Sequence, residues 1–128
     1  QSSKLWKEFP FSATLYNIKG AASHGLGRLD QAIEAYNDAL SIRPEYALAY
    51  GNMANALRDQ NRLEEAIKAY SRAISIKPDF ADAYNNLGIA YKGLDDNVNA
   101  SNMFKKAIEI DPEFLLAKNN LDGLDKEN

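Results

Sequence analysis

Seven asparagines stand at repeating positions and carry the side chains best suited to bind a ligand. One column of residues 34 apart holds Asn52, Asn86 and Asn120; a neighbouring column holds Asn17, Asn85 and Asn119, and Asn55 lies close to the first. A primary amide both donates and accepts hydrogen bonds, so a row of amides can hold an extended peptide backbone whatever its side chains are. The alternative is that these amides make local contacts between neighbouring structural units. The sequence alone favours neither interpretation.

A basic column with the same interval holds His24, Arg58 and Lys92. If each residue ends a helix, its positive charge interacts favourably with the helix C-terminus, which is the simpler interpretation. The second interpretation is that the column forms one edge of a binding groove, where its mild positive charge would favour an acidic ligand.

The sequence contains no pattern of catalytic residues. Its 128 residues include one histidine and no cysteine, which excludes a catalytic thiolate and a cysteine-ligated metal site. No sequence neighbour of His24 suggests a general acid–base pair, and no glycine-rich loop suggests phosphate binding. We therefore predict that the chain is not an enzyme and uses no cofactor.

One segment resembles the start of a calcium-binding loop, with Asp95, Asn97 and Asn99 at alternate positions. The position that needs glycine holds Ala100, and the position of the bidentate acid holds Lys106. We predict no metal site.

Charge and composition exclude other classes of partner. The net charge of −3 and the pI of about 5.1 argue against nucleic-acid binding. No apolar run reaches the roughly 18 residues of a membrane span, and no secretory signal opens the sequence. Together with the absence of cysteine, this favours a cytoplasmic location. Because the chain begins with Gln1, we expect it to be part of a longer protein or a processed one.

The elements that must position these side chains follow from an internal repeat. All four prolines lie 34 residues apart, at Pro10, Pro44, Pro78 and Pro112. Within each unit the apolar residues recur every three or four positions, as on one face of a helix. A break between two such stretches holds Gly27, Asn61 or Asp95, residue types that tolerate the left-handed conformation at a helix end. Each unit is therefore predicted to be a helix, a tight turn and a second helix.

Columns of matched size predict how the two helices pack. Small residues (Gly20, Ala54, Gly88) are expected where the helices approach most closely. A second small column (Ala32, Ala66, Ala100) is expected to face them, with the aromatic column (Tyr36, Tyr70, Phe104) filling wider gaps nearby.

These columns resemble the signature of the tetratricopeptide repeat family. In the third unit the signature positions hold Tyr84, Leu87, Gly88, Tyr91, Ala100, Phe104, Ala107 and Pro112. The resemblance implies an all-α fold, a right-handed superhelix of antiparallel helix pairs. The expected units are repeats at 13–46, 47–80 and 81–114, preceded by the tail of an earlier repeat helix at 1–12 and followed by a C-terminal capping helix at 115–128.

In this family the asparagine columns line the concave groove formed by the first helices of the repeats. Chaperone-binding members clamp a C-terminal carboxylate with lysine, asparagine and arginine at set positions. The matching positions here are Asn17, Ala21, Asn52, Asp82 and Asn86; one unit further along they are Gly51, Asn55, Asn86, Leu116 and Asn120. Neither set contains a cation, so the clamp is absent.

We therefore expect a non-enzymatic interaction scaffold that binds a protein or extended peptide in its groove. One alternative is that the chain is the repeat arm of a larger enzyme, such as a transferase, and recruits its substrate or partner. The other is weak self-association through the terminal helices, in which Trp6 and Leu116 would pair across copies.

Overall fold

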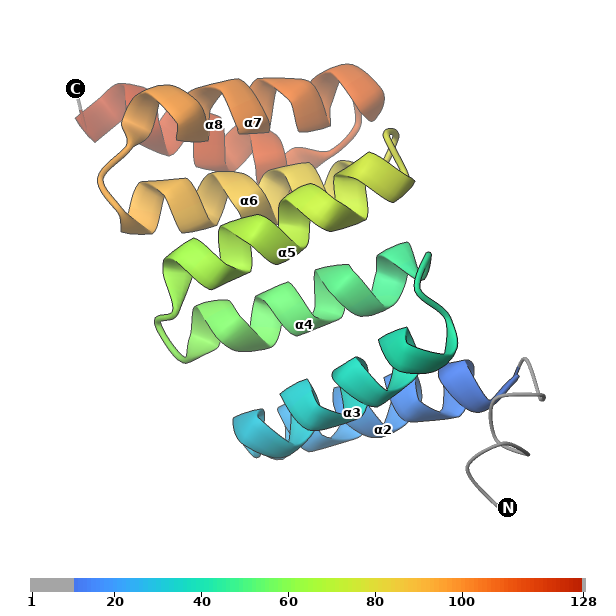
Figure 1. Cartoon of the computed structure of the whole chain (residues 1–128). Helices are drawn as coiled ribbons and strands as arrows, with labels where there is room; N and C mark the ends of the chain where they lie inside the picture. Colours follow the sequence, from blue (N-terminus) through green and yellow to red (C-terminus); the bar gives the residue numbers. More distant parts are fainter. Residues whose placement is uncertain (1–10, 128) are drawn as a thin grey trace, which may run out of the picture.

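The computed structural model describes residues 11–127, which form seven helices and no strand. The helices are α2 (Phe11–Gly25), α3 (Leu29–Ile42), α4 (Ala47–Asp59), α5 (Leu63–Ile76), α6 (Ala81–Gly93), α7 (Asn97–Ile110) and α8 (Leu115–Glu127). They form the expected all-α, right-handed superhelix of antiparallel helix pairs (Figure 1). The predicted helix tail at 1–12 lies mostly outside the described residues; within them, α2 already begins at Phe11.

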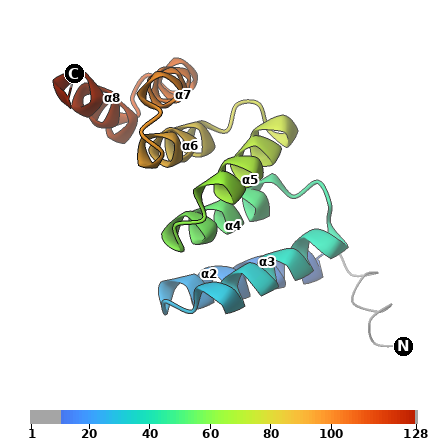
Figure 2. The same ribbon diagram turned by 60° about the vertical axis from the view of Figure 1, so that its left-hand side comes forward.

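The pairs α2–α3, α4–α5 and α6–α7 each pack closely, and each second helix packs on the first helix of the next pair. The first helices α2, α4, α6 and α8 also contact one another in series, whereas the second helices contact one another less. Figure 2 shows the three pairs and α8 following one another along the array. Because the first helices lie closer together, they form the inner, concave side of the superhelix.

Three left-handed residues end the tight turns inside the pairs. Gly27 has φ 77°, Asn61 has φ 61° and Asp95 has φ 60°, which confirms the prediction made from the break positions. The backbone N–H groups of Gly27, Asn61 and Asp95 each donate to a carbonyl of the preceding helix. Three residues of different type thus make the same helix-ending turn.

The turn before α7 contains a second acid, Asp96, next to the Asp95 that suggested a calcium loop. The Asp96 carboxylate accepts hydrogen bonds from the backbone N–H of Asn99 (3.2 Å) and from its side-chain amide (2.7 Å). Asp96 is therefore an N-cap, which satisfies a free donor at the start of the helix.

In the first and third pairs the aromatic ring lies at the closest approach of the two helices, which corrects the expectation that it fills a wider gap nearby. A Cβ atom added at Gly88 would lie 2.5 Å from Cε1 of Phe104, and one added at Gly20 would lie next to the Tyr36 ring. Tyr36, Tyr70 and Phe104 are all buried, as are the alanines of the second small column. At Gly20 and Gly88 the ring stands directly over the helix backbone and leaves no room for a Cβ atom.

Candidate functional site: a polar pocket on the concave side

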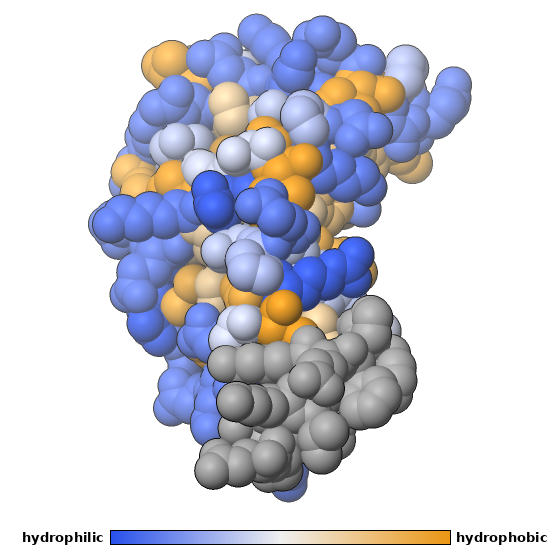
Figure 3. All heavy atoms as spheres, turned by 45° about the vertical axis from the view of Figure 1, so that its right-hand side comes forward, coloured by the Kyte–Doolittle hydropathy of each residue, from blue (hydrophilic) through white to orange (hydrophobic). Residues whose placement is uncertain are grey.

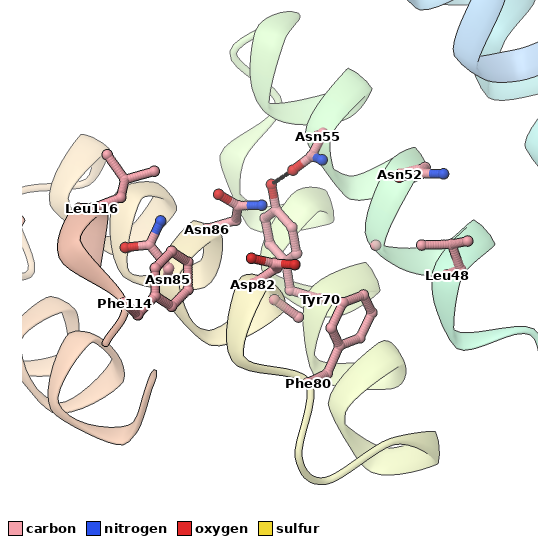
Figure 4. A pocket seen from close by; sticks show the side chains of 12 residues that line it. Leu48, Asn52, Asn55, Tyr70, Phe80, Asp82, Asn85, Asn86, Phe114 and Leu116 are labelled. Atoms are coloured by element: carbon pink, nitrogen blue, oxygen red, sulfur yellow. Dashed lines mark hydrogen bonds between the residues drawn. The ribbon is translucent and has the colours of Figure 1, made fainter. Parts of the chain in front are cut away.

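The first helices shape a pocket of about 330 Å³ around the middle of the array. Its lining comes from α4, α5, α6 and α8 and from the residues just before α6 and α8: Leu48, Gly51, Asn52, Asn55, Tyr70, Phe80, Asp82, Ala83, Asn85, Asn86, Phe114 and Leu116. In Figure 4, Leu48 and Asn52 lie on one side of this pocket and Phe114 and Leu116 on the other. Figure 3 shows how apolar and weakly polar surface mixes with hydrophilic surface on one face of the molecule.

Four of the seven predicted asparagines pair with each other between neighbouring first helices. The Asn52 amide donates to Oδ1 of Asn17 (3.1 Å), and the Asn120 amide donates to Oδ1 of Asn85 (2.9 Å). Asn17 and Asn85 are buried. For these two the interpretation as a local contact between units holds, since their acceptor oxygens face another part of the same chain.

The interface between α4 and α6 lacks such an asparagine pair, because Gly51 occupies the position that Asn17 and Asn85 hold in the other units. The Phe80 ring lies beside Gly51, 3.3 Å from where a Cβ atom would be. Asn86, the counterpart of Asn52 and Asn120, consequently has no asparagine to bond. Its half-buried amide lines the pocket, and no hydrogen bond to another described residue is recorded for it.

Asn55 is held by a buried tyrosine. The Tyr70 hydroxyl donates to Oδ1 of Asn55 and accepts a hydrogen bond from the Arg58 guanidinium (3.2 Å; Figure 4 shows the first bond). Burial raises the pKa of Tyr70, so the hydroxyl stays protonated and can donate. Asn55 lines the pocket, and its amide nitrogen has no hydrogen-bond partner among the described residues.

Replacing Tyr70 with phenylalanine should lower the free energy of unfolding by about 1 kcal/mol, because Asn55 and Arg58 each lose a partner in a partly buried place. Chemical denaturation followed by circular dichroism measures this. Tyr84→Phe is the control, because the Tyr84 side chain is half-buried and its hydroxyl makes no hydrogen bond with a described residue. Tyr16→Phe would not serve, because Tyr16 has an interaction of its own. Equal losses in Tyr70→Phe and Tyr84→Phe would contradict a specific role for the Tyr70 hydroxyl.

Two of the three residues in the basic column contact the Asp59 carboxylate, His24 from the neighbouring unit and Arg58 from the same unit. His24 Nε2 lies 2.6 Å from Oδ2 of Asp59, and the Arg58 guanidinium lies 3.9 Å from the other oxygen of the same carboxylate. Asp59 therefore offsets the positive charge at this place, and the geometry does not favour a basic edge formed by His24 and Arg58. Lys92 is exposed at the end of α6.

Sequence reasoning missed the His24–Asp59 contact, although a signal was present. Asn17–Asn52, His24–Asp59 and Asn85–Asn120 are all separated by 35 residues, one more than the repeat. That offset joins equivalent faces of adjacent first helices. The remaining predicted residue, Asn119, is exposed on α8 and does not line the pocket.

The described residues contain neither a candidate metal site nor a candidate membrane-spanning helix. Among residues 11–127, no group of three or more histidine, aspartate or glutamate side chains is placed to hold a metal ion. None of the helices in this range combines the length and the apolar character needed to cross a membrane.

Comparison with protein families and solved structures finds consistent similarities. A family model described as TPR repeat matches residues 20–57 and 54–95, and one described as tetratricopeptide repeat matches residues 81–114. No curated protein sequence matches the chain.

Three solved structures show how similar the folds are. The first TPR domain of Spaghetti (RPAP3) bound to the HSP90 peptide SRMEEVD is 22% identical, with a TM-score of 0.86 over 90% of this chain and 91% of that one. The Arabidopsis OM64 TPR domain is 23% identical, with a TM-score of 0.87 over 91% and 96%. MamA is 26% identical, with a TM-score of 0.85 over 98% of this chain and 73% of that one.

Proposed function

The chain belongs to the tetratricopeptide repeat family, and from this premise we propose that it is a protein-interaction module that binds an extended peptide in the pocket on its concave side. The observation that carries the proposal is the amide of Asn86, which lines the pocket without a partner among the described residues. A half-buried amide in this state can donate to a peptide carbonyl and accept from a peptide N–H.

Neighbouring groups add to the hydrogen-bonding capacity of the pocket. Asn52 uses its nitrogen for Asn17 and Asn55 uses Oδ1 for Tyr70, so Oδ1 of Asn52 and the nitrogen of Asn55 have no partner among the described residues. The pocket thus offers both hydrogen-bond donors and acceptors, and a peptide backbone presents both kinds of group. The domain of Spaghetti (RPAP3) offers a precedent in the same fold, since it was solved with a bound peptide.

The asparagines of the other interfaces have a different part in this proposal. Asn17 and Asn85 join neighbouring units, and their partners Asn52 and Asn120 hold the first helices in register. Asparagine thus has two roles in this proposal, contacts between units and contacts with the ligand. Asn86 is available for the second role because Gly51 stands where its asparagine partner would be.

Two adjacent asparagines allow a matched test. Asn86→Ala should weaken binding of a selected peptide about tenfold, because two hydrogen bonds to the ligand are lost, and should leave the free energy of unfolding almost unchanged. Asn85→Ala should lower the free energy of unfolding by about 1 kcal/mol, because Asn85 is buried and Asn120 loses its hydrogen-bond acceptor.

The peptides for this test come from panning a phage-displayed random library against the wild-type protein. They are then synthesised with acetylated and amidated ends, and their dissociation constants are measured by fluorescence anisotropy. A failure of panning to enrich any sequence, or unchanged affinity in Asn86→Ala, would contradict the proposed function.

The two other candidate functions gain no support from a specific contact. A repeat arm that recruits a substrate or partner for a larger enzyme would use the same concave pocket, and no contact of the described residues favours that role over the proposed one. For self-association, Trp6 lies outside the described residues, and Leu116 lies at the rim of the pocket, where a peptide would also contact it.

A further inference from the structure

The pocket has a distinctive charge. Asp82 is the single charged side chain among the residues that line it. It is exposed, and no ion pair or hydrogen bond of its carboxylate with another described residue is recorded. A ligand in the pocket therefore meets one negative charge and no cation among the lining residues; Lys77, outside the lining, lies over the Phe80 ring with Nζ 4.9 Å from its centroid.

Apolar side chains flank this acid on both sides. Leu48, Asp82 and Leu116 occupy equivalent positions of three successive first helices, α4, α6 and α8. Leu48 is 49% exposed and Leu116 is 55% exposed, so both can contact a ligand. The order along the groove is apolar, acidic, apolar.

Asp82 and Asn86 lie one helix turn apart on α6, so their side chains reach the same face of the helix. Figure 4 shows the two side chains side by side in the pocket, with Asp82 toward Phe80 and Asn86 toward Tyr70. A peptide whose backbone bonds to Asn86 consequently passes within reach of the Asp82 carboxylate.

From this arrangement we infer that the occupant of the pocket is an extended peptide with a lysine or arginine between two apolar side chains, the basic group facing Asp82. The inference rests on the proposed function, because it assigns a ligand class to the same pocket. The groove thus has the opposite charge preference from a carboxylate clamp, in which lysine and arginine face the ligand.

The helix spacing also sets the spacing in the peptide. Packed helices lie roughly 8–10 Å apart, and an extended chain advances about 3.3 Å per residue. The apolar side chains that contact Leu48 and Leu116 should therefore stand two or three residues to either side of the basic residue.

Asp82 also lies in the first turn of α6, where a negative charge stabilises the helix without any ligand. Glu64 supplies the matched control. It is an exposed acid in the first turn of α5, a second helix, and it does not line the pocket. Asp82→Asn and Glu64→Gln remove the same charge from the same kind of helix end, so only the former should change peptide selection.

The experiment compares phage panning of a random peptide library on wild type, Asp82→Asn and Glu64→Gln. We expect wild type and Glu64→Gln to enrich peptides with a basic residue flanked by apolar ones, and Asp82→Asn to lose the basic preference. In a selected peptide with blocked ends, changing the basic residue to glutamine should weaken binding to wild type about two- to fivefold, the strength of an exposed ion pair. The same change should have no effect on binding to Asp82→Asn.

The outcomes separate the two proposals. Enriched peptides without a basic preference, or a preference that persists in Asp82→Asn, would overturn this inference and leave the proposed function standing. No enrichment on any of the three proteins would overturn both. Equal thermal unfolding of Asp82→Asn and Glu64→Gln would show that a change in selection does not come from partial unfolding.

Discussion

Replacing Phe104 with alanine should lower the free energy of unfolding by about 3–5 kcal/mol. Phe104 is fully buried, and its ring packs over the backbone of α6 at Gly88 and in a cluster with Ala100 and Leu124. Alanine would remove the ring from the place where α6, α7 and α8 meet. Gly88 and Ala100, which face the ring, are too small to fill the resulting cavity.

Urea denaturation of wild type and variant, followed by circular dichroism, measures this loss. Val98→Ala on the same helix is the control: Val98 is 74% exposed, so its truncation should change stability by no more than about 0.5 kcal/mol. A loss below about 1 kcal/mol in Phe104→Ala would contradict the packing described for this crossing.

Gly88→Ala should destabilise the protein by about 1–3 kcal/mol, although alanine is the better helix former. The added Cβ atom would lie 2.5 Å from Cε1 and 2.7 Å from Cδ1 of Phe104, whose ring is fully buried. Relief requires that the ring or the whole of α7 move. Overpacking therefore outweighs the gain in helix propensity.

Gly123→Ala provides a control of opposite sign. Gly123 is also inside a helix, α8, but nothing lies within 4 Å of a Cβ atom added there. The same substitution should stabilise the protein by about 0.5–1 kcal/mol through helix propensity alone. If Gly88→Ala and Gly123→Ala were both stabilised, α6 and α7 would be packed less tightly at Gly88 than the structure shows.

The second unit shows that the crossing can be built with alanine. There Ala54 replaces glycine, and both Ala54 and Tyr70 are fully buried. The Tyr70 hydroxyl is fixed by Asn55 and Arg58, a contact that Phe104 cannot make. A ring with a polar anchor can thus stand beside an alanine, whereas the position of the Phe104 ring depends on the glycine.

The repeat made most of the fold predictable. The helix pairs follow from the period of the apolar residues, and the turns follow from the few residue types that adopt positive φ, as Gly27, Asn61 and Asp95 do. Both are local properties that recur three times, so an error in one unit would be visible against the others. The position of the rings over Gly20 and Gly88 was not predicted, because it depends on how the pairs cross and not on their spacing in sequence.

The site was predictable only in outline. The asparagine columns indicate a polar concave side, but the columns alone do not tell which amides are satisfied within the chain. That depends on contacts between adjacent first helices, at an offset of 35 residues, and on the single exchange of asparagine for Gly51. Asp82 was evident only as a mismatch to the carboxylate clamp; its place in the pocket, between Leu48 and Leu116, came from the structure.

The most direct test of the account is a nuclear magnetic resonance titration of the protein with a peptide obtained by panning. Side-chain amide resonances of asparagine report the site itself. We predict saturable shifts of the Asn86 side-chain amide, and of Asn52 and Asn55 beside it. The exposed amides of Asn37 and Asn102 on the second helices should stay unchanged. Shifts at Asn37 or Asn102 with an unchanged Asn86 would place the peptide outside the concave pocket and contradict the account.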